Sequence, residues 1–289
     1  MEYTSLTQLY QLAEESGRSL GQQALFDMAE EKGATQEAEF SRMAELLSLM
    51  EQSVVDGLDP HLQSPSGLTG PNAHKVLLGI QRDTVPDDLL SSVIAKSLAT
   101  ASSNACMGKV VAAPTAGACG ILPAVLLSAM EHGSISREDA VLGLFAAGAV
   151  GMVISKRATL AGAVGGCQAE CGAASAMAAA AYVQMQGGSN DMAIHSVAIA
   201  LKCCLGLVCD PVAGLVEVPC VKRNAALSAN ALSAATMALC GVKSIIPADE
   251  VIDAMGRVGR SMPETLRETG EGGIAVSPTG RALSEEILQ

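Results

Sequence analysis

The chain has 289 residues, a formal net charge of −12 at neutral pH and no basic cluster. Nucleic acids and anionic membranes are bound by clustered Lys and Arg, so this composition argues against both kinds of partner. Hydrophobic residues make up 49% of the chain but aromatic residues only 2%, so a core must be filled by Ala, Leu, Val, Ile and Met. Small side chains favour closely packed helices over a β-sandwich. We therefore expect an all-α, multi-helix fold with Gly-rich loops.

Residues 4 to 57 place apolar side chains at helical spacing, for example at Leu6, Leu9 and Leu12. We expect residues 1–57 to be a helical N-terminal portion, and residues 58–289 to be an all-helical region continuous with it. The stretch from Asp59 to Lys75 is rich in Pro, Gly and Ser and is expected to be a loop.

Loops of Ser, Thr and Gly can present backbone N–H groups and hydroxyls to a carboxylate. The alternative is a plain connection between helices. His61 and His74 of this stretch are expected to be surface histidines. The candidate substrate contacts in the loop are Ser66, Gly67, Thr69 and Gly70.

A long helix is expected from Pro86 to Met107, and another from about Ile121 to Glu131. Between them lies PTAGACG, a Gly-rich turn before a helix N-terminus, which is an arrangement suited to anions. Such turns are also common as plain structure. Cys119 in the turn is expected to be a packing residue. The candidate substrate contacts here are Asn104, Thr115, Ala116 and Gly117.

Two apolar stretches test a membrane alternative. Residues 140–155 are 16 uncharged residues interrupted by glycines, and residues 171–190 are mostly Ala with two Gln. A span needs about 20 predominantly apolar residues. Both stretches are expected to be buried core helices, and the helices themselves are expected over residues 136–153 and 168–186. Further helices are expected over residues 191–208, 224–240 and 248–258.

Nine cysteines are an odd number, they lie in apolar runs, and the N-terminus lacks a secretory signal pattern. This usage predicts reduced thiols and a cytoplasmic protein. Three of the cysteines lie at breaks in regular structure. Cys167 follows two glycines, Cys209 precedes Asp210-Pro211, and Cys220 follows Pro219 in an expected loop.

Thiolates are the usual ligands of iron-sulfur clusters, and Gly-rich loops leave N–H groups free to bond the sulfides. The separations of Cys167, Cys209 and Cys220 are 209 − 167 = 42 and 220 − 209 = 11 residues, which match no compact ferredoxin or zinc-ribbon pattern. Buried cysteines acting as small apolar residues therefore remain an alternative. Cys171 and His195 are expected to be core residues.

Two cations lie where each could contact a small molecule. Arg223 could pair with a substrate carboxylate through two hydrogen bonds, or face solvent at a helix start. Lys156 precedes a Gly-rich stretch, but the surrounding pattern fits a pyridoxal-phosphate lysine poorly. The polar stretch RETGEGG, with Arg267, Glu268 and Thr269, is expected to be a flap over a site.

Three long blocks carry a resemblance to a known family: GGCQAECG, LGLVCDPVAGLVEVPCVKRNA and SMPETLRETGEGGIAVSPTG. They resemble the α chain of the two-subunit, iron-sulfur-dependent bacterial L-serine dehydratases. The resemblance runs from the MEQSVVDGLDP segment to the C-terminus, and includes the SGLTG and PTAGACG stretches. It implies a single catalytic domain in which Cys167, Cys209 and Cys220 bind a 4Fe-4S cluster, and the loop residues above contact L-serine.

The resemblance also implies the chemistry. Three thiolates leave one iron of the cluster without a protein ligand, and this iron could act as a Lewis acid in the β-elimination of water from serine. The products would be pyruvate and ammonia, as in amino-acid catabolism and gluconeogenesis. The required general base is not identified in this chain. Single-chain relatives carry an N-terminal domain with an SSSHT-type motif and end with a cysteine. This sequence shows neither feature, so we expect a separate β subunit to complete the site and the enzyme to be an oligomer.

Three alternatives stay open. A cysteine desulfidase would use the same cluster with another leaving group. A non-catalytic subunit could use the three thiolates for a cluster or for zinc. A purely structural helical protein would bind no metal, and its cysteines would only fill the core.

Overall fold

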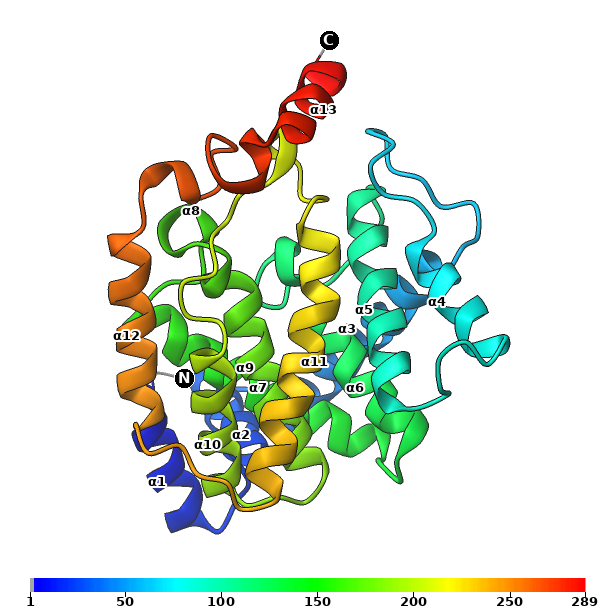
Figure 1. Cartoon of the computed structure of the whole chain (residues 1–289). Coiled ribbons are helices and arrows are strands. Elements are labelled where there is room, and N and C mark those ends of the chain that lie inside the picture. The colour runs from blue at the N-terminus through cyan, green and yellow to red at the C-terminus, as the bar shows by residue number, and fades with distance from the viewer. Residues whose placement is uncertain (1–2, 289) are drawn as a thin grey trace.

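The computed structural model describes residues 3–288. Within these residues the chain forms thirteen α-helices and no strand, which confirms the predicted all-α class (Figure 1). The helices are α1 (Leu6–Ser16), α2 (Leu20–Lys32), α3 (Gln36–Gly57), α4 (Asn72–Gln81), α5 (Leu89–Ala105), α6 (Ile121–His132), α7 (Arg137–Arg157), α8 (Gly162–Gly165), α9 (Ala173–Met185), α10 (Asn190–Lys202), α11 (Cys220–Leu239), α12 (Ala248–Ser261) and α13 (Pro278–Leu288). Short turns of other helical types lie between them: η1 (Ala116–Ala118), η2 (Gln168–Gly172), η3 (Val212–Gly214), η4 (Glu264–Leu266) and η5 (Gly273–Val276).

Side-chain caps fix the starts of several helices. Ser19 and Ser136 form capping boxes at α2 and α7, in which each serine hydroxyl accepts from the third helical N–H. Thr35, Asp88 and Ser189 cap α3, α5 and α10 in the simpler way. These local signals explain why the sequence places the helix starts well.

Helix α9 lies at the centre of the core. Apart from Gln184, all of its residues are buried, and most are Ala. Small side chains let α7, α10 and α11 approach α9 closely, as Figure 1 shows for the middle of the molecule. Gly143 and Gly151 of α7 face Met185 and Met177 of α9, where a β-carbon would come within about 3 Å of the methionine side chains. The glycines therefore set the spacing of this helix pair.

Helix α7 is long and apolar enough to cross a membrane by length and composition. However, 67% of its apolar window is buried inside the protein. It packs against α9 and α2 and thus serves as the core helix that the sequence predicted. Both apolar stretches, in α7 and in α9, are core helices.

One apolar core runs through the molecule. It includes Leu6, Leu20 and Leu47 of the first three helices together with Ile154 and Leu201 of later ones. The boundary placed at residue 57 in the sequence stays a prediction.

Several helices differ from the prediction. Helix α4 begins at Asn72, inside the stretch expected to be a loop, and α13 follows the closing Gly-rich loop. Helix α10 ends at Lys202 instead of Val208, because the chain turns at Gly206, whose φ is +87°. Helix α11 begins at Cys220, which is therefore a first helical residue and not a loop residue.

Candidate active site

The three predicted ligand cysteines come from three different segments. Cys167 directly precedes the π-turn η2, Cys209 lies in an extended connection, and Cys220 opens α11. Their exposed fractions are 3%, 5% and 9%, and all three thiols are free of disulfides. Figure 1 shows α8 and the start of α11 at the same end of the molecule, the end that carries α13.

Gln168 fixes the backbone on which Cys167 lies. Its fully buried side chain donates to the carbonyls of Gly165 (2.9 Å) and Met255 (3.1 Å) and accepts from the N–H of Gly206 (3.0 Å). The Gln168 N–H also donates to the carbonyl of Leu207 at 3.1 Å. The buried Gln168 amide thus joins the turn before α9, the middle of α12 and the chain leading to Cys209.

The closing loop pairs directly with Cys209. The Cys209 N–H donates to the carbonyl of Leu266 (2.9 Å), and the Glu268 N–H donates to the carbonyl of Cys209 (2.7 Å). This short parallel bridge places the predicted flap residues Arg267 and Glu268 beside the cysteine. Glu268 has a φ of +69°, a left-handed conformation that is uncommon for residues other than glycine.

The three thiols influence one another electrostatically. A hydrogen bond from Cys171 lowers the pKa of Cys167, and the Arg223 guanidinium lowers it further against the effect of burial. Burial raises the pKa of Cys220 to about 12, and the charge of Cys167 adds to that shift. Burial also raises the pKa of Cys209, with contributions from Glu170, Cys167 and Cys220. The charge of Cys167 thus contributes to the raised pKa of both Cys209 and Cys220.

Arg223 is held by the chain itself. Its guanidinium forms an ion pair with Asp210 (2.9 Å) and donates to the carbonyl of Val208 (2.7 Å). Asp210 is 2% exposed and also accepts from the N–H of Ile274 at 2.8 Å. The ion pair therefore fastens the Cys209 connection to α11 and to η5. The predicted pairing of Arg223 with a substrate carboxylate stays a prediction.

Glu170 is a site residue that the sequence analysis missed. Its carboxylate accepts from the Thr115 hydroxyl (2.8 Å) and lies 4.0 Å from the sulfur of Cys209. Burial raises its pKa, and the charge of Glu268 adds to the shift, while the Thr115 hydrogen bond opposes it. A β-carbon on Gly162 would come within 2.5 Å of the Glu170 carboxylate, so the carboxylate occupies the space that this glycine leaves.

Asn224 joins the predicted PTAGACG turn to the start of α11. Its amide nitrogen donates to the carbonyls of Gly117 (2.8 Å) and Cys220 (2.9 Å), and its oxygen accepts from the N–H of Gly120 (2.9 Å). The side chain is 1% exposed. The structure thus brings Thr115 and Gly117 next to the cysteines, with the exposed Ala116 between them.

The SGLTG loop bonds to a second missed residue, Glu217. The hydroxyls of Ser64 and Ser66 donate to its two carboxylate oxygens at 2.6 and 2.7 Å. Ser66 and Gly67 line a cavity of about 660 Å³, shared with Leu215 and residues of α13. The Thr69 hydroxyl is buried and has no hydrogen-bond partner.

The remaining candidates lie at the edges of this region or outside it. Gly70 is half-buried at the end of the SGLTG loop, and Asn104 is half-buried in the last turn of α5. Lys156 is exposed in the last turn of α7. His195 accepts from the N–H of Ser244 at 3.2 Å, as a satisfied helix histidine does.

Buried, free thiols are the donor chemistry of an iron-sulfur cluster, and Cys167, Cys209 and Cys220 supply three of them from separate segments. A β-carbon on Gly162 would lie 2.5 Å from the Glu170 carboxylate and 3.3 Å from the Cys209 sulfur, so only glycine fits beside them. Among residues 3–288, no group of three or more His, Cys, Asp or Glu side chains is gathered tightly enough to hold a single metal ion. The thiolates of a cubane cluster bind three different irons and need not meet at one point. The ligand set stays a prediction.

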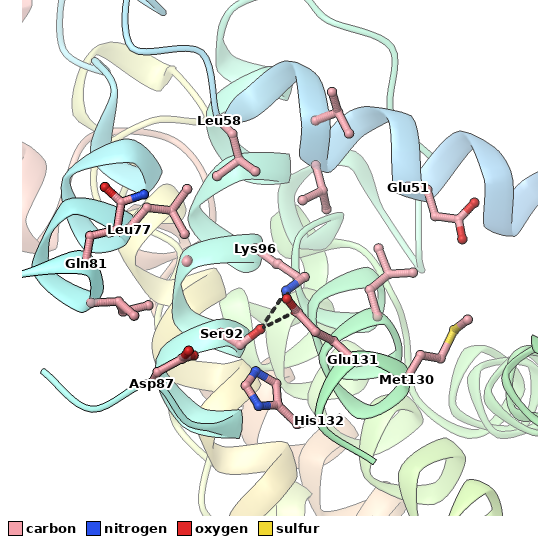
Figure 2. A pocket seen from close by; sticks show the side chains of 15 residues that line it. Glu51, Leu58, Leu77, Gln81, Asp87, Ser92, Lys96, Met130, Glu131 and His132 are labelled. Atoms are coloured by element: carbon pink, nitrogen blue, oxygen red, sulfur yellow. Dashed lines mark hydrogen bonds and ion pairs between the residues drawn. The ribbon is translucent and has the colours of Figure 1, made fainter. Parts of the chain in front are cut away.

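Figure 2 shows another cavity of about 660 Å³, among α3, α4, α5 and α6. The Lys96 ammonium donates to Ser92 (2.6 Å) and pairs with Glu131, and Ser92 also donates to Glu131 at 3.0 Å. Apolar side chains such as Leu58 and Leu77 line the wall. None of the predicted site residues lines this cavity, and its central charges neutralise one another.

Fold and site together define an all-helical protein with a buried thiol and carboxylate centre at one end of a helical bundle. A sequence model described as serine dehydratase alpha chain matches residues 11–275. The chain belongs to the serine dehydratase alpha chain family.

Individual relatives agree. The "Probable L-serine dehydratase, alpha chain" of Bacillus subtilis is 49% identical over 255 residues, which cover 88% of this chain and 85% of the relative. The "L-serine dehydratase, alpha chain" of Peptoniphilus asaccharolyticus is 51% identical over 71% of this chain and 70% of its own. The match to "L-serine dehydratase TdcG" of Escherichia coli, at 37% identity, covers 78% of this chain but only 52% of that protein.

Proposed function

We propose that this chain is the α subunit of an L-serine dehydratase, an ammonia-lyase that converts L-serine to pyruvate and ammonia. Membership of the family supports the activity. The observation that supports the mechanism is that three predicted ligand thiols are buried and free, and that one of them, Cys209, lies 4.0 Å from the Glu170 carboxylate, which accepts from Thr115.

Cys167, Cys209 and Cys220 would hold a 4Fe-4S cluster. When bound, the cluster would supply an iron without a protein ligand as a Lewis acid for the hydroxyl and carboxylate of serine. The chain's own residues would fix the positions of the ligands. Buried Asp210 and half-buried Arg223 hold the Cys209 connection against α11.

Substrate binding is proposed for the two polar loops. The turn around Thr115 and Gly117 is fixed by Asn224 and lies just before α6, whose N-terminus favours a carboxylate. The SGLTG loop would form the opposite wall. Since no residue of this chain is identified as the base for the α-proton, we propose that a β subunit completes the site, in an oligomer located in the cytoplasm.

The first test is iron and acid-labile sulfide content after anaerobic reconstitution. We expect about four of each per wild-type chain and a loss in Cys209→Ser. Cys119→Ser is the matched control, because Cys119 is equally buried and free but is not a predicted ligand. Wild-type chain that retains neither iron nor sulfide, or a Cys209→Ser variant that retains both, would contradict the ligand assignment.

The second test is the release of ammonia and a 2-oxo acid by the reconstituted α chain with its β subunit. L-serine and L-cysteine would give pyruvate and L-threonine would give 2-oxobutanoate, and we expect release from L-serine in preference to the other two. Preference for L-cysteine would point to the desulfidase alternative, and zinc without sulfide in the purified chain would point to a non-catalytic subunit.

A further inference from the structure

Glu217 lies in the connection between Cys209 and Cys220 and is buried, with 5% of its surface exposed. Its partners are the hydroxyls of Ser64 and Ser66, at 2.6 and 2.7 Å. The ion pairs found within residues 3–288 do not involve it. A buried carboxylate without a cation is costly unless hydrogen bonds satisfy it. The hydrogen bonds from the two serine hydroxyls therefore stabilise the buried carboxylate of Glu217, and they also fix the positions of both serine side chains.

The same hydroxyls shape the loop. Ser64 Oγ accepts from the N–H of Thr69 (3.0 Å), and Ser66 Oγ accepts from the N–H of Leu68 (3.1 Å). The Ser64 N–H closes the loop on the carbonyl of Thr69 at 2.8 Å. Each serine hydroxyl has a single proton, which it donates in its hydrogen bond to Glu217. Ser66 therefore has no proton left to donate to a substrate carboxylate.

On its other side Glu217 is tied to a predicted ligand. Its carbonyl accepts from the N–H of Val221 at 3.0 Å, in the first turn of α11, which begins at Cys220. The connection is closed further by the N–H of Val212, which donates to the carbonyl of Val218 at 2.9 Å. A displacement of Glu217 would therefore move both the loop and the backbone at Cys220.

We propose that Glu217 is a positioning residue that fastens the loop over residues 64–70 to the cysteine connection, so that the loop is held against the site as one unit with it. Ser64 and Ser66 act through Glu217 and do not bind substrate through their hydroxyl protons. The expected effect on kinetics rests on the proposed function. The attachment of the loop by Glu217 does not depend on which reaction the protein catalyses.

The test compares Glu217→Gln with Glu39→Gln. The amide keeps the shape of Glu217 but offers one acceptor oxygen, so one serine hydroxyl loses its partner. Glu39 of α3 is the matched control. Its carboxylate is 2% exposed and is held by Lys32 of α2 and Arg42 of α3, and neither partner belongs to the site. Hydrogen exchange of residues 64–72 reports on the loop in the α chain. KM and kcat for L-serine are measured on the reconstituted enzyme with its β subunit.

We expect Glu217→Gln to speed exchange in residues 64–72 about tenfold, which corresponds to the loss of about one hydrogen bond. KM should rise about tenfold while kcat changes less than threefold and iron content stays at the wild-type level. Unchanged exchange in this segment would overturn the proposal, as would the same exchange and KM changes in Glu39→Gln. The exchange result decides the fastening even if the wild-type enzyme does not act on serine.

Ser66→Ala provides a second variant with little risk to folding, because Ser66 is only half-buried. We expect it to speed exchange in the loop, and to add little to the effect of Glu217→Gln when the two are combined. A higher KM in Ser66→Ala with unchanged exchange would instead show that the Ser66 hydroxyl binds substrate directly, and would overturn the proposal.

Discussion

Replacement of Asn224 by alanine tests how the PTAGACG turn is attached to α11. The change removes three hydrogen bonds, to Gly117, Gly120 and Cys220, from a side chain that is 1% exposed. A neutral hydrogen bond contributes about 1 kcal/mol, and a buried group left without its partner costs about 1–3 kcal/mol. We therefore expect a loss of about 3 kcal/mol in the free energy of unfolding.

Urea unfolding of the α chain measures this loss as a lower midpoint with an unchanged slope. Asn230→Ala is the matched control on the same helix. Asn230 is half-buried and donates to Ser175 (2.9 Å) and to the carbonyl of Ala200 (3.1 Å), away from the turn. It should cost about 1–2 kcal/mol. A loss below about 1 kcal/mol in Asn224→Ala, or one no larger than in the control, would refute the attachment of the turn through this amide.

Two further predictions concern space and pH. Gly162→Ala places a β-carbon 2.5 Å from the Glu170 carboxylate and 3.3 Å from the Cys209 sulfur, so the iron content after reconstitution should fall by more than half. The control Gly148→Ala meets nothing within 4 Å and should keep the wild-type iron content. Full iron content in Gly162→Ala would contradict the close fit around Gly162. Burial raises the pKa of Cys119 and Cys204 to about 12. Because the folded state holds these protons more tightly than the unfolded chain, where a thiol has a pKa of about 8.5, stability is full below that value and falls as pH rises towards 12, by about 2 kcal/mol per thiol at pH 10. Urea midpoints measured from pH 7 to 10 should show this loss, and Cys119→Ala should reduce it; a midpoint independent of pH would refute it.

The sequence predicted the helices wherever local signals mark them. Caps such as Ser136 and apolar spacing lie within a few residues of the helix they define, so α5, α6 and α7 were placed to within a few residues. Helix α13 was missed because its start, Pro278, follows a Gly-rich loop and the short turn η5, which the sequence analysis took together as one loop. Proline at a first helical position was the available signal.

The polar contacts of the candidate site were harder to predict from the sequence than the helices were. The cysteines were singled out by the family resemblance, but their polar neighbours act across long separations. Glu170 meets Thr115, Asn224 meets Gly117, and Glu217 meets Ser64, at separations of 55, 107 and 153 residues. Helical or strand periodicity in the sequence spans only a few residues and cannot predict such a long-range contact. The only signal in the sequence was that these three side chains, Glu170, Asn224 and Glu217, lie inside the same blocks as the cysteines.

The place of the site follows from the way the small-residue helices pack. Ser228 of α11 donates to Ser97 of α5 at 3.0 Å, and α11 also packs along α9. Helix α5 ends, and α9 and α11 begin, at the same end of the bundle in Figure 1, so the loops before or after them converge there although they are far apart in sequence. Larger side chains between these helices would separate those ends. The candidate site therefore depends on the Ala-rich core. Close helix packing brings these loops together, so that Glu170, Asn224 and Glu217 can form hydrogen bonds with residues far away in the sequence.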